Sequence, residues 1–188
     1  MSDHSAITTA YQRAMGYLQR GEIDASEPWI AQVTRSIPAW YVEVQDTVAR
    51  VAREQGRFDR AASALSNALH VHPDANRAYQ LGENLTDLGD DEEASRAFMR
   101  AVQLDITHTD AHIRLGMIHQ SLHRFDLARS CFERAILNDP RAAVARYYLA
   151  LNCLETGDSR RALSQLHFVL QIEPSYAPAR MLQGQVGH

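Results

Sequence analysis

The stretch that decides the fold covers residues 109–176 and contains one pattern twice. Residues 109–142 read TDAHIRLGMIHQSLHRFDLARSCFERAILNDPRA, and residues 143–176 read AVARYYLALNCLETGDSRRALSQLHFVLQIEPSY. Each copy has Leu and a small residue, then a turn residue, an Ala, a large apolar residue and a closing Pro, in the same order and at the same spacing. A fixed period of 34 residues is the mark of a repeat protein.

The same period extends to the N-terminal half of the chain. Spacings of 35, 33, 34 and 34 residues separate the turn residues Gly21, Gly56, Gly89, His123 and Gly157. Seventeen residues after each turn stand Pro38, Pro73, Ile106, Pro140 and Pro174. Small residues recur five positions after the turns, at Ser26, Ala61, Ala94, Ala128 and Ala162. Each repeat therefore predicts two amphipathic helices of about 14 residues that meet at the turn and end before the Pro.

Three departures from the pattern carry local predictions. Pro28 falls inside the second helix of the first repeat, so we expect that helix to start late, with Ser26 as N-cap and Pro28 in the first turn. Ile106 replaces the closing Pro, so Asp105 and the loop 107–109 are expected to end the preceding helix. His123 replaces a turn glycine and is expected to take a left-handed conformation.

The period and the order of Leu-Gly, Ala, Phe, Ala and Pro resemble the tetratricopeptide repeat family over residues 7–176. This resemblance implies an all-α, right-handed superhelical solenoid of about five helix-turn-helix repeats, each burying its apolar face on the next. The expected repeats are 7–40, 42–74, 75–108, 109–142 and 143–176. Residues 1–6 are expected to form an N-terminal tail, and residues 177–188 a short helix, at about 178–186, with a tail.

Composition removes several classes of function. All 19 basic residues are Arg, so mechanisms that need a lysine amine are excluded. The formal net charge of −4 opposes binding to nucleic acid. No apolar run approaches the ~20 residues that cross a bilayer, and the N-terminus has no signal segment, so we expect a cytoplasmic protein without membrane insertion. Cys131 and Cys153 lack the spacing of a metal site or a disulfide framework and are expected to be reduced core residues.

No sequence motif indicates catalysis or a cofactor. The chain lacks Gly-x-Ser-x-Gly, a Gly-rich phosphate loop and His-Glu-x-x-His, and the acidic cluster 90–93 suits the start of a helix. A metal-binding or catalytic protein built on His108, His112, His119 and His123 remains the alternative of another class. These histidines have i,i+4 spacing but no evident third ligand, so we expect helix packing instead.

A second charged pattern lies in residues 43–60. Four arginines that could form a basic stripe are interleaved with four acidic residues, which favours mutual pairing on the surface. The arginines are Arg50, Arg53, Arg57 and Arg60, and the acidic residues are Glu43, Asp46, Glu54 and Asp59.

The resemblance further implies a concave groove, lined by the first helix of each repeat, that receives peptides. The positions that it projects onto the groove are Tyr11, Met15, Asp46, Arg50, Arg53, Asn76, Tyr79, Gln80, Glu83, Asp110, Ile113, Arg114, Met117, Tyr147, Tyr148 and Leu151. We expect the apolar end of the groove to be the binding hot spot, because Tyr79, Tyr147 and Tyr148 offer large rigid surfaces and Arg114 can orient a carboxylate or backbone carbonyl beside them. Packing between repeats is the alternative role of these tyrosines.

These observations predict a non-catalytic protein-interaction module that acts as a scaffold, an adaptor or a chaperone-like protein. Family members that grip the C-terminal carboxylate of chaperones use a Lys/Asn/Arg clamp, whose early positions are here Tyr11, Met15 and Asp46, so that role is disfavoured. The alternative within the binding class is a structural subunit, including a homo-oligomer, that assembles through its C-terminal end, because the helix 178–186 is a short cap.

Overall fold

The computed structural model describes residues 2–33 and 38–186, and in this part of the chain it contains eleven α-helices and no strand. The predicted all-α helical repeat solenoid is confirmed. The chain divides between Leu104 and Asp105 into two compact parts.

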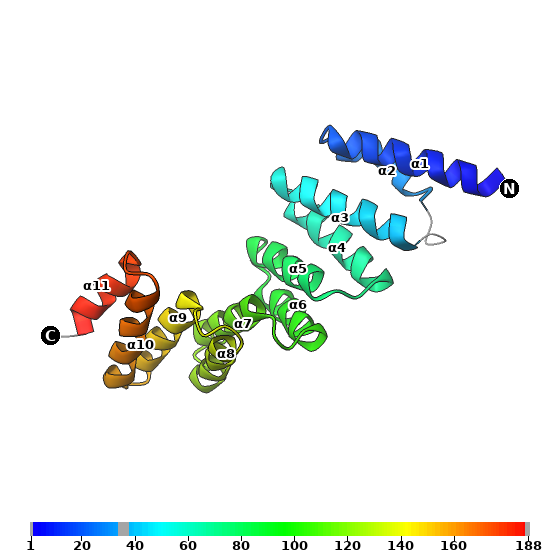
Figure 1. Cartoon of the computed structure of the whole chain (residues 1–188). Helices are drawn as coiled ribbons and strands as arrows, with labels where there is room; N and C mark the ends of the chain where they lie inside the picture. The colour runs from blue at the N-terminus through cyan, green and yellow to red at the C-terminus, as the bar shows by residue number, and fades with distance from the viewer. Residues whose placement is uncertain (1, 34–37, 187–188) are drawn as a thin grey trace. The chain divides into compact units, whose positions relative to one another are not determined.

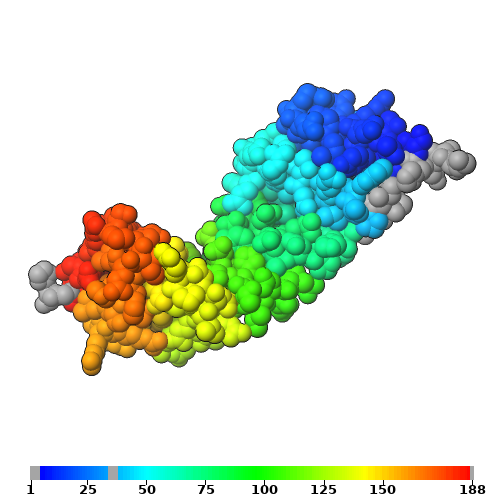
Figure 2. All heavy atoms as spheres, in the orientation of Figure 1, coloured from blue at the N-terminus to red at the C-terminus, as the bar shows by residue number. Residues whose placement is uncertain are grey.

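The N-terminal part contains three helix pairs. Its helices are α1 (Ser2–Gln19), α2 (Ile23–Ile30), α3 (Pro38–Glu54), α4 (Phe58–Val71), α5 (Ala75–Asp87) and α6 (Asp91–Leu104). The helices of each pair lie side by side, and α3 also contacts α1 and α2 while α4 contacts α5 (Figure 1). In the space-filling view the atoms of successive pairs meet without a break (Figure 2).

The C-terminal part contains two further pairs and a final helix. Its helices are α7 (Thr109–Ser121), α8 (Phe125–Asn138), α9 (Ala143–Glu155), α10 (Ser159–Ile172) and α11 (Ala177–Val186). Helix α9 packs on α7 and α8, and α11 packs on α10. The predicted short C-terminal helix is present, and it buries Ala179 fully.

The turns within the pairs fall at the predicted residues. Gly21, Gly56, Gly89 and Gly157 have φ angles of 75°, 71°, 79° and 81°, in the region that favours glycine. His123 has φ 56°, so the prediction that it takes the left-handed conformation is confirmed. Its ring lies edge-on to that of Phe125, with 5.7 Å between the ring centroids.

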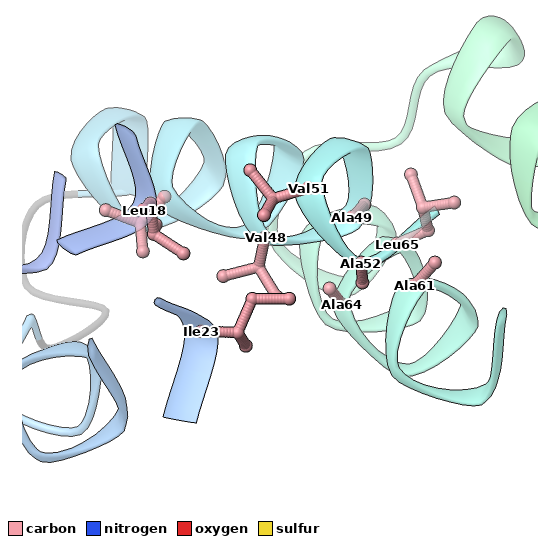
Figure 3. Packing of buried hydrophobic residues seen from close by; sticks show 10 residues of the cluster. Leu18, Ile23, Val48, Ala49, Val51, Ala52, Ala61, Ala64 and Leu65 are labelled. Atoms are coloured by element: carbon pink, nitrogen blue, oxygen red, sulfur yellow. The ribbon is translucent and has the colours of Figure 1, made fainter. Parts of the chain in front are cut away.

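Small side chains let the helices approach closely in the core. In the N-terminal part, Ile23 of α2 and Leu18 of α1 pack with Val48 of α3, while Ala61 and Leu65 of α4 pack on the same helix (Figure 3). These residues are at most 1% exposed. A helix of this solenoid therefore buries its apolar face only by contact with its neighbours.

The small residue after Leu in the first helices is a packing position for a phenylalanine. A Cβ atom added to Gly82 would lie 2.5 Å from Cε1 of Phe98, and one added to Gly116 would lie 2.4 Å from Cε1 of Phe132. Both rings are buried, at 1% and 0% exposure. The Leu-Gly and Phe positions of the sequence pattern are therefore two sides of one contact.

The prediction for the second helix of the first repeat is wrong in two respects. Helix α2 begins at Ile23 with Glu22 as N-cap, so Ser26 is not the cap and Pro28 lies inside the helix rather than in its first turn. Ser26 is fully buried, and its hydroxyl donates to the Ile23 carbonyl over 2.5 Å. Ser26 therefore occupies the buried packing position at which the other repeats have alanine.

The structure also bears on the predictions for two helix ends, the start of α1 and the end of α6. Residues 2–6, expected as a tail, extend helix α1, which begins at Ser2. Helix α6 ends at Leu104, and Asp105 then accepts hydrogen bonds from the Thr107 amide and hydroxyl, over 2.9 and 2.7 Å. The predicted role of Asp105 and the following loop in place of a proline is confirmed.

Candidate functional site

A groove with a volume of about 1390 Å³ lies between the first helices of two successive repeats in the N-terminal part. Its walls are α3 and α5, and Leu65 and the end of α4 complete its floor. Asp46, Arg50, Asn76 and Glu83, all projected from the sequence, line it, as do the projected Arg53 and Gln80.

A bidentate ion pair is among the contacts that join the two walls. The Arg77 guanidinium of α5 donates from Nε and Nη2 to the two carboxylate oxygens of Asp46 in α3, over 2.7 and 2.9 Å. Its Nη1 also donates to the His72 carbonyl over 3.2 Å. The hydrogen bond to Asp46 raises the pKa of Arg77. This bidentate geometry holds α3 and α5 in register at the groove.

The predicted pairing of the four arginines with the interleaved carboxylates is confirmed only for Arg50 and is wrong for the other three. Arg50 pairs with Glu54 over 2.9 Å within α3. The remaining pairs join successive helix pairs, at 3.4 Å for Arg53–Glu83, 2.9 Å for Arg57–Asp24 and 2.6 Å for Arg60–Glu27. Neighbouring repeats bring these carboxylates close, which spacing within one segment does not reveal.

Aromatic residues stand near the N-terminal end of α3. The rings of Tyr11 and Trp40 are stacked, with 5.0 Å between their centroids. Burial raises the pKa of the Tyr11 phenol, and its hydrogen bond to Glu43 and the charge of that carboxylate add to the rise. Tyr11 and Met15 both pack against the core of the N-terminal part rather than lining the groove.

The other projected aromatic residue of the N-terminal part, Tyr79, is half-buried. Its ring lies 5.6 Å from that of the buried Phe98, and its hydroxyl donates to Glu83 over 3.1 Å. Tyr79 thus fixes Glu83, which is one of the groove residues.

The projected residues of the C-terminal part are half-buried or buried, except Asp110, which is exposed. Tyr148 stacks on the core ring of Phe132 with 5.8 Å between centroids, and Tyr147 contacts both Tyr148 and Tyr176. Ile113 is 7% exposed, and Met117 packs beside it. Arg114 and Leu151 are partly buried. Tyr147 and Tyr148 therefore take part in packing, and their role as a binding hot spot stays a prediction.

Sequence reasoning missed Arg77 and Asn84 as groove residues. Arg77 is the third residue of its helix, where the later first helices have Ala111, Ala145 and Ala179, each fully buried. Aligning the repeats therefore singles out Arg77, because the later first helices have a buried alanine at the same position. Asn84 lies near the end of the same helix and is 1% exposed.

His112 and Cys153 are buried, and Cys131 is half-buried. Burial lowers the pKa of His112, whose Nε2 lies 3.0 Å from the Ile106 carbonyl. Burial also raises the pKa of the Cys131 and Cys153 thiols. Within residues 2–33 and 38–186, no group of three or more His, Cys, Asp or Glu is placed to hold a metal ion.

The same described ranges contain no helix that is both long and apolar enough to cross a membrane.

Solved structures with the same fold cover nearly the whole chain. A crystal structure of MamA has a TM-score of 0.74 at 20% identity, with 93% of this chain and 95% of that chain covered. The crystal structure of YrrB, described as a TPR protein with an unusual peptide-binding site, has a TM-score of 0.75 at 19% identity, with 98% of each chain covered. At these identities the likeness shows the fold.

Curated relatives match over shorter segments. Tetratricopeptide repeat protein 6 of Homo sapiens is 27% identical over 119 residues, which are 61% of this chain and 23% of that protein. The probable UDP-N-acetylglucosamine--peptide N-acetylglucosaminyltransferase SPINDLY of Hordeum vulgare is 26% identical over 98 residues, 48% of this chain and 10% of that protein. The chain thus spans less than a quarter of the length of these relatives.

The sequence profile described as Tetratricopeptide repeat matches residues 49–111 and 113–166, which together are more than half of the chain. These matches include the Gly and Phe positions that pack against one another within the pairs α5–α6 and α7–α8. The chain belongs to the tetratricopeptide repeat family.

Proposed function

We propose that this protein is a non-catalytic interaction module, a scaffold or adaptor that binds a segment of a partner protein in the groove between α3 and α5. The observation that supports the proposal best is the groove itself, which two successive repeats line with both apolar and charged side chains. The fold is one of protein-interaction modules, and the similar YrrB is described as having a peptide-binding site.

The size and chemistry of the groove favour a peptide over a small molecule. Its volume of about 1390 Å³ exceeds the ~300–1,000 Å³ of most small-ligand pockets. Its arginines are engaged in ion pairs with carboxylates of the same part, so they position the walls of the groove. Pro38 and Ala39, which are exposed, and the half-buried Val71 supply apolar surface that a partner side chain can bury.

A pair of matched variants tests this proposal. Peptides are selected on the whole chain from a random 12-residue display library, synthesised, and measured for binding to the wild type, Gln80→Trp and Gln103→Trp. Gln80 is exposed and lines the groove, whereas Gln103 is exposed on α6 and does not. The indole should fill the groove and weaken binding at least about tenfold in Gln80→Trp, as the loss of central interface contacts does.

Helicity and unfolding must match the wild type in both variants, because a folding defect would also reduce binding. If the selected peptides bind Gln80→Trp as tightly as Gln103→Trp, the groove is not the binding site and the proposal is wrong.

A second candidate function, a structural subunit that assembles through its C-terminal end, is favoured by Met181. This side chain is 69% exposed on α11, a ten-residue helix. Among the described helices, α11 has extensive contacts only with α10. Light scattering at high micromolar concentration should then show an oligomer that Met181→Glu converts to a monomer. A monomeric wild type would contradict this alternative.

A further inference from the structure

We propose that the occupant of the groove is a cationic segment, with an Arg or Lys side chain next to apolar residues, and that the cation binds near Glu43 and Asp74. This inference rests on the proposed function, because it names the chemistry of the partner segment for the same groove. Three features of the groove support it: its charge balance, the pairing of its arginines and the apolar surroundings.

The charge balance of the groove is negative. Five carboxylates and three guanidinium groups line it. The carboxylates are Glu43, Asp46, Glu54, Asp74 and Glu83, and the guanidinium groups are those of Arg50, Arg53 and Arg77. A negative groove attracts cationic partners and repels anionic ones.

Each guanidinium in the groove already has a carboxylate partner within the groove. Arg77 binds Asp46, Arg50 binds Glu54 and Arg53 binds Glu83. These pairs leave Glu43 and Asp74 without an ion pair to an arginine of the described chain. Both stand at the N-terminal end of the groove, Glu43 in the second turn of α3 and Asp74 as the N-cap of α5.

The groove also contains an acceptor that no group of the described chain uses. Asn84 is 1% exposed, and its Nδ2 donates to the Gln80 carbonyl over 2.7 Å, while its Oδ1 has no hydrogen-bond partner in the described part. A buried acceptor without a partner is unfavourable. This atom is itself buried and lies near the C-terminal end of α5, away from Glu43 and Asp74, so the inference does not depend on it.

Apolar residues surround the two carboxylates. Pro38, Ala39 and Val42 line the groove beside Glu43, and Val71 lies near Asp74 at the end of α4. An apolar surface accommodates the methylene stem of Arg or Lys while the charged head reaches a carboxylate. Exclusion of water also strengthens the attraction between the two charges.

Selection on the whole chain tests the inference with defined probes. Peptides selected from the random 12-residue library, and sensitive to Gln80→Trp, should be enriched in Arg or Lys next to apolar residues. Replacing that cation by Gln in a synthetic peptide should weaken binding roughly two- to fivefold, the range for partly exposed ion pairs. The affinity of the original peptide should also fall as salt is raised from 0.05 to 0.5 M, as expected of exposed charges.

Matched carboxylate variants locate the cation. Glu43→Gln should weaken the cationic peptide roughly two- to fivefold, and Glu155→Gln, an exposed glutamate of α9 outside the groove, should leave it unchanged. Asp74 is unsuitable for this purpose because it caps α5 through the Arg77 amide. Glu43→Arg, at an exposed position, should weaken the cationic peptide further and improve binding of its Glu-substituted counterpart.

The outcomes separate this inference from the proposed function. Selected peptides that are sensitive to Gln80→Trp but acidic or uncharged would overturn the cationic occupant and leave the groove intact as a binding site. Cationic peptides that bind Glu43→Gln and Glu43→Arg as tightly as the wild type would also overturn it. Peptides that are insensitive to Gln80→Trp would overturn both proposals together.

Discussion

Replacing Gly82 by alanine tests whether the close contact between α5 and α6 is essential to the solenoid. The new Cβ atom would lie 2.5, 2.7 and 2.8 Å from three atoms of the Phe98 ring, so the ring or the helix must move. The ring has little freedom, because Phe98 is 1% exposed and the ring of Tyr79 lies 5.6 Å away. We therefore expect Gly82→Ala to strain the pair.

Two opposing effects set the size of the change. Inserting a methyl group into a tightly packed core costs about 1–3 kcal/mol, whereas alanine is favoured over glycine inside a helix by about 1 kcal/mol. Gly16→Ala isolates the second effect, since Gly16 lies in α1 and the nearest atom to its added Cβ is Nη1 of Arg20, at 3.8 Å. The free energy of unfolding should therefore be about 1–3 kcal/mol lower for Gly82→Ala than for Gly16→Ala.

Urea unfolding followed by helicity measures the difference. Hydrogen exchange in α5 and α6 adds local resolution, because repeat proteins can unfold in parts. The double variant Gly82→Ala/Phe98→Leu provides a further check, since the smaller side chain leaves room for the methyl group. Its loss of unfolding free energy should be smaller than the sum of the losses in the two single variants. Equal stabilities of Gly82→Ala and Gly16→Ala would refute the proposed packing, as would strict additivity in the double variant.

Three further predictions concern single side chains. Because burial lowers the pKa of His112 and of His119, the unfolded state binds more protons than the folded state near and below pH 6.5. The stability from this effect should be fully present above about pH 6.5 and fall as the pH is lowered, and His112→Gln should reduce that slope in urea titrations at each pH. His123→Gly should raise stability by up to about 1 kcal/mol, since glycine adopts φ 56° without strain; a lower thermal midpoint would contradict this. A double-mutant cycle of Asp46→Asn and Arg77→Met should give a coupling of about 1 kcal/mol or more, and a value near zero would contradict the wall-to-wall ion pair.

The sequence pattern predicts the backbone of this protein well because the same physical demand recurs in every repeat. A left-handed residue must end the first helix, and Gly21, Gly56, Gly89 and Gly157 supply it. A small residue must face the phenylalanine of the second helix, as Gly82 faces Phe98. These demands depend on neighbours about 16 residues away, so their period can be read along the chain.

The first repeat shows where such reasoning fails. Ser26 is both a good N-cap and a small residue at a packing position, and the sequence alone gives each role equal support. The structure buries it completely, so close approach of the helices outweighs capping at this position. The early end of α2 at Ile30 follows from neither rule, and Pro28 lies within the helix two residues before that end.

The groove could be predicted only in part, because its chemistry arises from pairs of residues about 30 positions apart. The family pattern places Asp46, Arg50, Asn76 and Glu83 in the groove. It does not show which of these side chains remain available to a binding partner. Because Asp46 and Arg77 pair with each other, neither charged group is available to a binding partner. Only the packed structure shows that the remaining negative charge gathers at one end of the groove.

The position of the groove couples binding to the stacking of repeats. Its two walls, α3 and α5, belong to successive repeats, so the site exists only while those repeats are packed together. An occupant that touches both walls binds the stacked state alone and must stabilise it, by RT ln(1 + [L]/Kd) for a ligand of concentration [L]. Hydrogen exchange in α3 to α5 should therefore slow with peptide concentration, whereas a peptide bound to one helix alone would protect that helix without affecting the junction.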